Sequence, residues 1–207
     1  MLPVMLNLTG RVVVVVGGGS VGLRKAATAR EAGASLRLID PHPSDLGSLK
    51  RDVTWVAEAY EADHLDGASL VFACAPAVVN ARVVADATGR GVWVNSATDP
   101  GQGDCVLPAV VRRGGLTLAV STGGASPALA QRIREKLEAE FDAPYVEWVR
   151  LLQEFRKDVL ALVSDSVRRR TLLSALADWP WLDRIRVEGI DAVRVAMREE
   201  IHRVAQS

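Results

Sequence analysis

The sequence predicts an α/β protein whose first half is a doubly wound parallel sheet and whose last third is a small helical domain. Three observations support this prediction. An uninterrupted run of five valines at 12–16 suits a strand that is covered on both faces, as in a parallel sheet. Strand and helix patterns alternate over roughly the first hundred residues. From residue 145 onward the patterns are helical only, and 207 residues suffice for one full domain and a smaller helical one.

The elements of the first half follow each other in the order expected for right-handed crossovers between parallel strands. Strands are predicted at residues 11–16, 35–40, 53–57, 69–74 and 91–94. Helices are predicted at 20–32 and 77–89, and a short turn at 62–66. In such a sheet the carboxyl ends of the strands share one edge, where ligands bind. The segments that follow these strands are therefore the first candidates for a site.

The pattern changes after Pro100. Two strands at 106–111 and 116–121 flank residues 112–115 and predict a hairpin that turns at its glycines. Ser126 suits a helix N-cap and Pro127 the first helical position, so a helix is expected to about residue 140. Further helices are predicted at 145–163, 165–177 and 189–204, with Trp179-Pro180-Trp181 in a break between them.

A glycine pattern follows the valine strand. Gly17, Gly19 and Gly22 match G-x-G-x-x-G where a strand turns into a helix, which indicates a Rossmann-like dinucleotide-binding loop. The helix that begins at Ser20 would present free N–H groups to a pyrophosphate. Asp40 ends the next strand, 23 residues after Gly17, where a carboxylate meets a ribose 2′-OH. This favours NAD over NADP as the cofactor, although the neighbouring His42 could soften the preference, and a glycine turn without ligand is the alternative.

The composition excludes several classes of protein. The 25 Lys and Arg balance the 25 Asp and Glu, which gives no general attraction to nucleic acid or membrane. The two cysteines, Cys74 and Cys105, lie far apart in the sequence and suit reduced thiols of a cytoplasmic protein. The three histidines show no ligand spacing, so no metal site is expected. Residues 1–8 lack the basic start of a signal peptide, and no apolar stretch approaches the length of a membrane span.

Two loops carry candidate chemistry. Asp99 lies just after the fifth predicted strand, where a carboxylate could act as an acid/base; its alternative role is to cap the Asp-Pro turn. The glycine-rich segment 121–126 at a helix start could bind an anion, or it is only a tight turn. Basic residues cluster around this segment and suit a polyanionic ligand, although such runs are often solvated faces: Arg112, Arg113, Arg132, Arg134 and Lys136.

With these segments in view, the chain resembles the precorrin-2 dehydrogenase/sirohydrochlorin ferrochelatase family, the N-terminal part of siroheme synthase. The resemblance covers nearly the whole chain and is carried by 16–26, 120–130 and 134–137, together with Asn80, Asn95, Pro100 and Pro108. It implies NAD-dependent oxidation of precorrin-2 to sirohydrochlorin. In some members insertion of Fe(II), as a substrate, follows and gives siroheme. No methyltransferase segment follows, so a stand-alone cytoplasmic enzyme is expected.

The resemblance also implies an organisation and a set of contacts. A Rossmann domain is expected at 1–110, a dimerisation segment at 111–143 and a helical domain at 144–207, assembled as a homodimer. Cofactor contacts carry over to Gly19, Ser20, Val21, Asp40, Pro41, His42, Cys74 and Ala75, beside the predicted Gly17 and Gly22. Contacts with the tetrapyrrole are expected at Asn95, Arg112, Arg113 and Arg132, and in the loop at Ser121, Thr122, Gly123, Gly124 and Ser126.

Two departures from the family bear on its chemistry. The predicted catalytic positions are Thr98 and Asp99, because the family's aspartate falls on Thr98 and this chain has its carboxylate one place later. An acidic run of the family is replaced by apolar residues at 73–77. A misplaced base affects metal insertion more than hydride transfer, because insertion must remove two pyrrole N–H protons. Dehydrogenase activity is therefore the prediction. The alternatives are another NAD-linked reductase, an NAD(H)-binding redox-sensing module without tetrapyrrole chemistry, and a partner that keeps only the fold.

Overall fold

The computed structural model, which describes residues 1–206, shows two compact units, Met1–Leu107 and Pro108–Ser207. The predicted boundary between residues 143 and 144 lies inside the second unit, so a separate domain at 144–207 stays a prediction. Ser207, the last residue of that predicted domain, lies outside the described residues.

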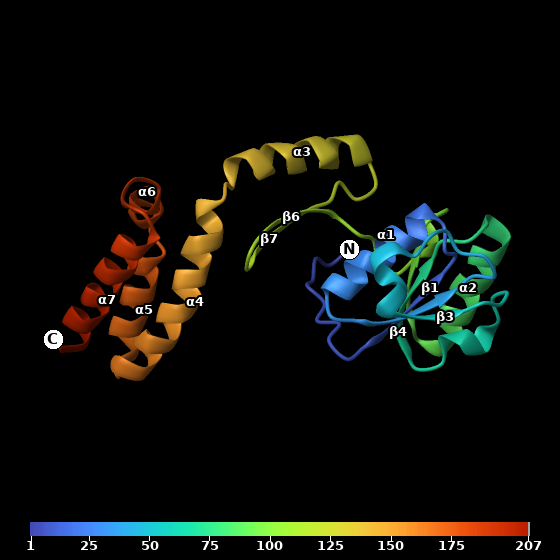
Figure 1. The fold of residues 1–207 in the computed structure, drawn as a ribbon, viewed down its shortest axis with the longest axis horizontal. Helices are drawn as coiled ribbons and strands as arrows, with labels where there is room; N and C mark the ends of the chain where they lie inside the picture. The colour runs from blue at the N-terminus through green and yellow to red at the C-terminus, as the bar shows by residue number, and fades with distance from the viewer. Residues whose placement is uncertain (207) are drawn as a thin grey trace. The chain divides into compact units, whose positions relative to one another are not determined.

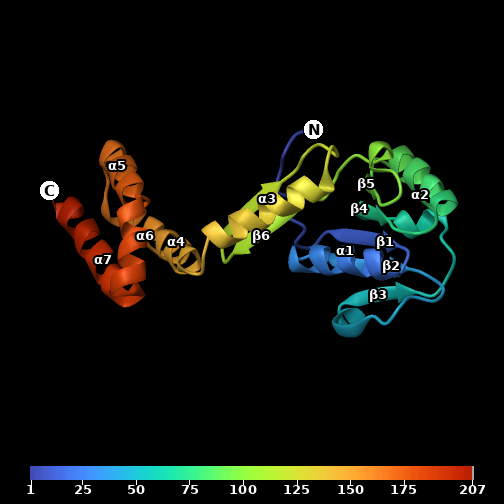
Figure 2. The same cartoon turned by 90° about the horizontal axis from the view of Figure 1, so that it is seen from above.

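The first unit is built on a five-stranded parallel sheet (Figure 1). Its strands lie in the order β3-β2-β1-β4-β5 (Figure 2). Its strands are β1 (Val12–Val16), β2 (Ser35–Ile39), β3 (Val53–Val56), β4 (Ala68–Ala73) and β5 (Trp93–Ser96). Val13, Val14 and Val15 of the central strand are fully buried, as expected for a strand covered on both faces. The predicted α/β fold with a doubly wound, Rossmann-like parallel sheet is confirmed.

Helices cover the two faces of this sheet. They are α1 (Ser20–Glu31) and α2 (Ala77–Arg90), and short 3-10 helices lie in the connections: η1 (Gly47–Arg51), η2 (Ala62–Leu65) and η3 (Pro100–Gln102). Val15 packs with Ala26 of α1, whereas its neighbour Val14 packs with Val83 of α2, because successive strand side chains point to opposite faces. β5 begins two residues later than predicted, because Gly91 ends α2 with a left-handed φ of 68°.

The second unit begins with an antiparallel pair, β6 (Ala109–Arg113) and β7 (Leu116–Val120). Helix α3 (Pro127–Glu140) lies along this pair (Figure 2). Gly114 and Gly115 form the predicted turn, and Gly114 has a left-handed φ of 57°. β6 begins three residues later than predicted, because Pro108 has no N–H to donate to a strand ladder.

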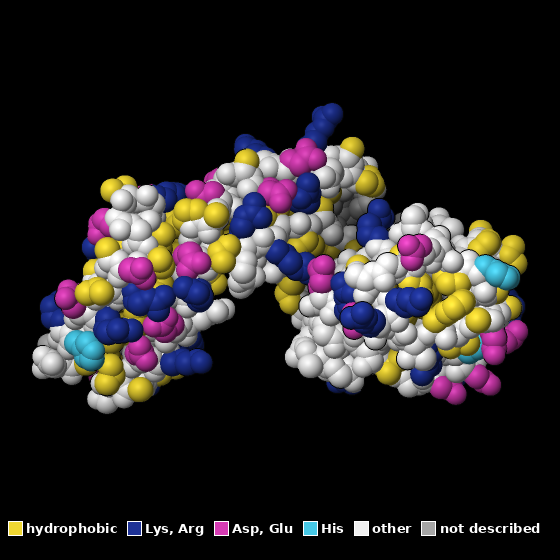
Figure 3. All heavy atoms as spheres, in the orientation of Figure 1, with side chains coloured by type: hydrophobic (Ala, Val, Ile, Leu, Met, Phe, Trp, Pro, Cys, Tyr) yellow, Lys and Arg dark blue, Asp and Glu magenta, His cyan; other side chains and the backbone are white. Residues whose placement is uncertain are grey.

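Four helices complete the second unit: α4 (Pro144–Leu162), α5 (Ser166–Leu176), α6 (Trp179–Glu188) and α7 (Ile190–Gln206). On α4 the buried residues Trp148, Leu151, Phe155 and Val159 recur every three or four positions, which places them on one face. This face packs with Met197 of α7 in the core of the bundle. Basic and acidic side chains are interspersed over the outside of these helices (Figure 3). Within residues 1–206, every helix is too short or too polar to span a bilayer.

The predicted break at 179–181 is wrong, because these residues open α6. The side chain of Asp178 accepts the N–H of Trp179 at 2.9 Å and caps the helix. Pro180 lies in the first turn, where the helix needs no N–H donor. The Trp-Pro-Trp sequence therefore starts a helix and does not interrupt one.

Candidate functional site

The loop between β1 and α1 is closed so tightly that three of its glycines, Gly17, Gly18 and Gly22, leave no room for a side chain. A Cβ at Gly18 would lie 2.5 Å from the Cβ of Pro43. Gly17 has a φ of 102°, and a Cβ there would lie 2.5 Å from the carbonyl oxygen of Cys74. A Cβ at Gly22 would lie 1.9 Å from the carbonyl oxygen of Gly17. Gly17 therefore lets the loop pass the end of β4, and Gly22 lets α1 pack against the turn.

Gly19, the middle glycine of the G-x-G-x-x-G pattern, faces open space instead. A Cβ at Gly19 would meet no described heavy atom within 4 Å, and Gly19 is the N-cap of α1. The first turn of the helix, at Ser20 and Val21, is exposed, and its backbone N–H groups have no partner within the helix. Open backbone at the positive end of a helix dipole fits a pyrophosphate.

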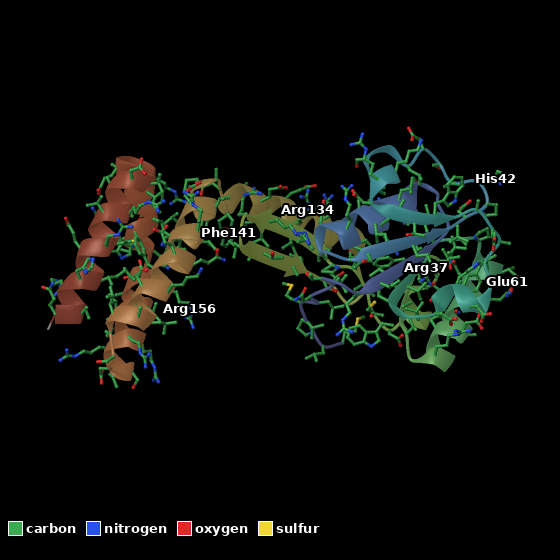
Figure 4. The ribbon with its side chains drawn as sticks, turned by 60° about the horizontal axis from the view of Figure 1, so that its bottom comes forward. Arg37, His42, Glu61, Arg134, Phe141 and Arg156 are labelled. Carbon is green, nitrogen blue, oxygen red and sulfur yellow. The ribbon has the colours of Figure 1, made fainter. Side chains whose placement is uncertain are left out.

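Asp40 lies just after β2, beside the glycine loop. Its carboxylate accepts two backbone N–H groups: Oδ2 accepts that of Gly18 at 2.6 Å, and Oδ1 that of His42 at 2.7 Å. Each oxygen keeps a second lone pair, so the carboxylate can also accept ribose hydroxyls. Pro41 and His42 lie on the exposed loop that follows (Figure 4). Together with the open backbone at Gly19, these residues fit a dinucleotide.

The loops after β4 and β5 are joined by the buried side chain of Asn80. Its Oδ1 accepts the N–H of Ala75 at 2.9 Å, and its Nδ2 donates to Oγ1 of Thr98 at 3.1 Å. Ser96 Oγ lies 3.4 Å from the same Thr98 oxygen and accepts the N–H of Asp99 at 3.2 Å. The Thr98 hydroxyl is therefore held in a polar cluster, and its catalytic role stays a prediction.

Asp99 is exposed where the chain leaves β5. Its Oδ1 accepts the N–H of Gly101 at 2.9 Å, so the turn-capping role considered for this residue is present. Its Oδ2 has no hydrogen-bond partner in the described part of the chain. One oxygen can therefore hold the turn while the other remains available to a proton.

A third group lies deeper, between the sheet and α1. Asn95 is only 4% exposed; its Oδ1 accepts a hydrogen bond from Nζ of Lys25, and its Nδ2 donates to the carbonyl oxygen of Cys105 at 2.8 Å. Asn95 therefore anchors Lys25 and the Cys105 segment, and a direct contact with substrate stays a prediction. Burial raises the pKa of the Cys74 thiol at the end of β4, so this thiol is neutral near pH 7.

Two residues of these clusters, Asn80 and Lys25, are absent from the predicted site. Asn80 shares the buried face of α2 with Val83 and Ala87, so a polar residue on a predicted apolar face was the available signal. Lys25 stands three residues after the last glycine of the loop and looks in sequence like any surface lysine of a helix. Its half-buried setting depends on the ends of β4 and β5, which the local sequence does not contain.

In the second unit, the glycine-rich loop between β7 and α3 is closed by its own hydroxyls. Thr122 Oγ1 accepts the N–H of Ser126 and donates to its carbonyl oxygen, both at 3.1 Å. Ser121 Oγ accepts the N–H of Gly123 at 3.2 Å, and Gly123 and Gly124 have left-handed φ of 63° and 90°. Ser126 also caps α3, as predicted. The tight-turn alternative is therefore present, and anion binding by this loop stays a prediction.

The three arginines predicted to bind substrate have different surroundings. Arg112 and Arg132 are exposed. Arg113 instead donates from Nε to the carbonyl oxygen of Phe141 at 2.7 Å, and from a terminal nitrogen to that of Glu138 at 2.8 Å. These carbonyl groups lie at the C-terminal end of α3, where Figure 4 labels Phe141. Arg113 therefore caps a helix, and a contact with substrate stays a prediction for all three.

Replacing Arg113 by alanine should lower the free energy of unfolding of the second unit by about 2 kcal/mol, because hydrogen bonds from a charged group to helix-end carbonyls are lost. Thermal unfolding followed by circular dichroism measures this loss. Arg112→Ala is the matched control. The Arg112 guanidinium has no partner among the described residues, so the change should stay within about 0.5 kcal/mol. Equal stability of the two variants would contradict the capping role.

The predicted residues thus form two sets. The cofactor positions, Thr98 and Asp99 lie at the carboxyl ends of the strands in the first unit, whereas the arginines and the loop at 121–126 belong to the second unit. Among residues 1–206, no three His, Cys, Asp or Glu side chains are grouped so that they could hold a metal ion.

The fold and the glycine loop define the class of protein: it is a dinucleotide-binding protein of the Rossmann type. Two family models match the chain, one described as putative NAD(P)-binding over residues 4–109, and one described as sirohaem biosynthesis protein central over residues 113–140. The first model matches half of the chain, so the chain belongs to this NAD(P)-binding family. The resemblance to the precorrin-2 dehydrogenase part of siroheme synthases, predicted from the sequence, is confirmed by these matches and by the relatives below.

Relatives and a solved structure agree with this assignment. The siroheme synthase of Pseudomonas entomophila (strain L48) is 37% identical over 199 residues, which are 94% of this chain and 43% of that protein. The siroheme synthase of Ectopseudomonas mendocina (strain ymp) is 39% identical over 171 residues, 82% of this chain and 37% of that protein. The chain therefore spans less than half the length of these curated relatives. A solved structure described as "SirC, precorrin-2 dehydrogenase" is 27% identical, with a TM-score of 0.81 over 98% of this chain and 100% of that one.

Proposed function

We propose that the chain is an NAD-dependent dehydrogenase that oxidises precorrin-2 to sirohydrochlorin in siroheme biosynthesis. The observation that carries the proposal is the open backbone of the glycine loop at Gly19. It lies on a fold that matches the solved structure described as SirC, precorrin-2 dehydrogenase over 98% of this chain. The siroheme synthase relatives support the same pathway. NAD is proposed over NADP because a 2′-phosphate would be repelled by the carboxylate of Asp40.

The reaction removes a hydride and a proton from the macrocycle. Bound NAD+ supplies the hydride acceptor. The chain's own residues bind the cofactor through the N-terminal turn of α1 and Asp40, and Asn80 keeps the loops after β4 and β5 together. Asp99 is the proposed proton acceptor, because its Oδ2 is free of hydrogen bonds to the described residues.

Asp99→Asn separates the two roles of this residue. The asparagine oxygen can still accept the N–H of Gly101 and hold the turn, but it cannot take up a proton at neutral pH. Turnover of precorrin-2 should therefore fall by at least about tenfold with the melting temperature unchanged. Steady-state rates at saturating substrate measure this effect. If Asp99→Asn turned over precorrin-2 as fast as the unmodified chain, Asp99 would have only its turn-capping role.

The substrate side of the proposal rests on the second unit. Precorrin-2 is a flat macrocycle rich in carboxylates, so the exposed cations Arg112 and Arg132 suit it. A homodimer is also proposed, because β6 and β7 form a sheet of only two strands and α3 exposes Leu129 and Ile133. Light scattering measures the mass in solution, and a monomer at working concentrations would reject the dimer.

The test of the activity is to supply precorrin-2 with NAD+ and follow the absorbance of NADH. Formation of NADH at the same rate as formation of sirohydrochlorin supports the dehydrogenase activity. No NADH above the blank rejects it. The alternative, a redox-sensing module, would bind NAD(H) without turnover. Insertion of Fe(II) stays a prediction from the family resemblance and is tested by adding Fe(II) to sirohydrochlorin. A cytoplasmic location is proposed on the free thiols of Cys74 and Cys105.

A further inference from the structure

Lys25 brings a positive charge to a half-buried position in the first unit. It lies in the second turn of α1, and its Nζ donates to Oδ1 of Asn95. The same ammonium lies over the ring of Phe72, 5.6 Å from the ring centre. Both of these partners are neutral, so they orient the ammonium without cancelling its charge.

No carboxylate balances this charge within residues 1–206. None of the ion pairs of this part of the chain includes Lys25. Its titratable neighbours include the thiols of Cys74 and Cys105, and burial raises the pKa of both, so they are neutral near pH 7. Arg24 adds a second cation nearby. Burial lowers the pKa of Lys25, as expected for a cation without an acidic partner.

The position of Lys25 in the sheet places it on one side of the cofactor loop. Phe72 of β4 and Asn95 of β5 are neighbours in register, and Cys74 directly follows β4. Asp40, the proposed ribose contact, directly follows β2, which lies on the other side of the central strand β1. In dinucleotide-binding sheets the cofactor lies across the carboxyl end of the central strand, with its two halves on opposite sides of that strand. Lys25 therefore lies on the side of the nicotinamide half, below the strand ends.

An unbalanced cation at such a place has a cost, because desolvation of a charge without a partner is unfavourable. Charged groups that lack an acidic partner and are partly desolvated concentrate at functional sites. The nicotinamide ring is positively charged when oxidised and neutral when reduced. A cation beside it therefore repels the oxidised form and leaves the reduced form unaffected.

We propose that Lys25 is a fixed positive charge that makes this site bind NADH more tightly than NAD+, and thereby favours hydride transfer from substrate to cofactor. The inference rests on the proposed dehydrogenase function, in which NAD+ is the acceptor. If the site binds NADH more tightly than NAD+ by a given factor, linkage requires the equilibrium between bound NAD+ and bound NADH to shift toward NADH by the same factor. Lys25 therefore acts on the charge of the nicotinamide ring through space and does not touch the reacting atoms.

The test compares dissociation constants of NADH and NAD+, measured by calorimetry, and needs no turnover. In Lys25→Met the ratio of the NADH constant to the NAD+ constant should rise by about threefold to tenfold. A tenfold change corresponds to about 1.4 kcal/mol, or about 30 mV for a two-electron couple. Lys25→Arg keeps the charge and should keep the ratio of the unmodified chain.

Two further variants make the test independent of folding. Lys25→Gln is neutral but can still donate to Asn95 Oδ1, so it should show the changed ratio even where Lys25→Met does not fold. Arg30→Gln removes a cation from the last turn of the same helix, where Arg30 pairs with Asp52, and should leave the ratio unchanged. A ratio altered by less than threefold in the folded neutral variants overturns the proposal. An unmodified chain that binds neither NADH nor NAD+ would instead reject the proposed function.

Discussion

Gly19→Ala is expected to leave the fold nearly intact and to weaken the binding of NADH by about a hundredfold. A Cβ at this position meets no described atom within 4 Å, and the backbone of Gly19, with φ −73° and ψ 179°, suits any residue. Loss of glycine at this N-cap should cost less than about 1 kcal/mol. In the proposed binding mode, the added methyl group would fill the space through which a phosphate oxygen reaches the N–H groups of α1. Losing two hydrogen bonds to a charged group, each worth about 1.5 kcal/mol, corresponds to roughly a hundredfold in affinity.

A titration of NADH fluorescence measures the dissociation constant, and thermal unfolding measures the stability of the same variant. Gly89→Ala in α2 is the control, because a Cβ there also meets nothing within 4 Å and Gly89 has no part in the cofactor loop. It should bind NADH like the unmodified chain. Binding of NADH by Gly19→Ala within threefold of the unmodified chain would contradict a pyrophosphate at the start of α1.

Gly22→Ala should instead damage the fold. Its Cβ would lie 1.9 Å from the carbonyl oxygen of Gly17, a backbone atom that can move only with the whole loop. The free energy of unfolding of the first unit should fall by about 3 kcal/mol or more, as in severe overpacking. For a unit of this size the melting temperature should fall by roughly 10 °C or more. Differential scanning calorimetry resolves this change.

Helix propensity alone predicts the opposite sign for this substitution, because alanine inside a helix is favoured over glycine by about 1 kcal/mol. Gly89→Ala measures the effect of helix propensity alone, because Gly89 lies in α2 with open space around its Cβ. This variant should be neutral or stabilised by up to about 1 kcal/mol. If Gly22→Ala were as stable as Gly89→Ala, the close approach of α1 to the Gly17 turn would not constrain the fold.

The parts of the fold that were predicted correctly have local signals. The apolar valine run predicted a strand buried on both faces, and Val14 is fully buried in the centre of the sheet. The glycine spacing predicted the tight turn, and Gly17 and Gly22 are two of the positions that leave no room for a Cβ. The cap at Ser126 also has a local cause, since a hydroxyl bonds an N–H three residues on. These signals need only residues that are neighbours in sequence.

The contacts that the sequence did not predict join residues far apart. The guanidinium of Arg113 caps α3 at Phe141, 28 residues further along the chain, while its predicted contact with substrate stays a prediction. The hydroxyl of Thr98 accepts a hydrogen bond from Asn80 of α2, and its predicted catalytic role also stays a prediction. Lys25 was absent from the predicted site, and it bonds Asn95 of β5. In each case the hydrogen-bond partner lies too far along the chain for the local pattern to identify it.

The amino-acid sequence by itself determined the order of strands and helices in the first unit, the glycine loop at 17–22 and the family, because periodicity, glycine spacing and motif residues act over short stretches of chain. Only the tertiary structure decided which polar side chains near the strand ends are free. Parallel strands bring loops together that are tens of residues apart, and the hydrogen bonds formed there use up some side chains and leave others, such as Oδ2 of Asp99, without a partner in the described chain.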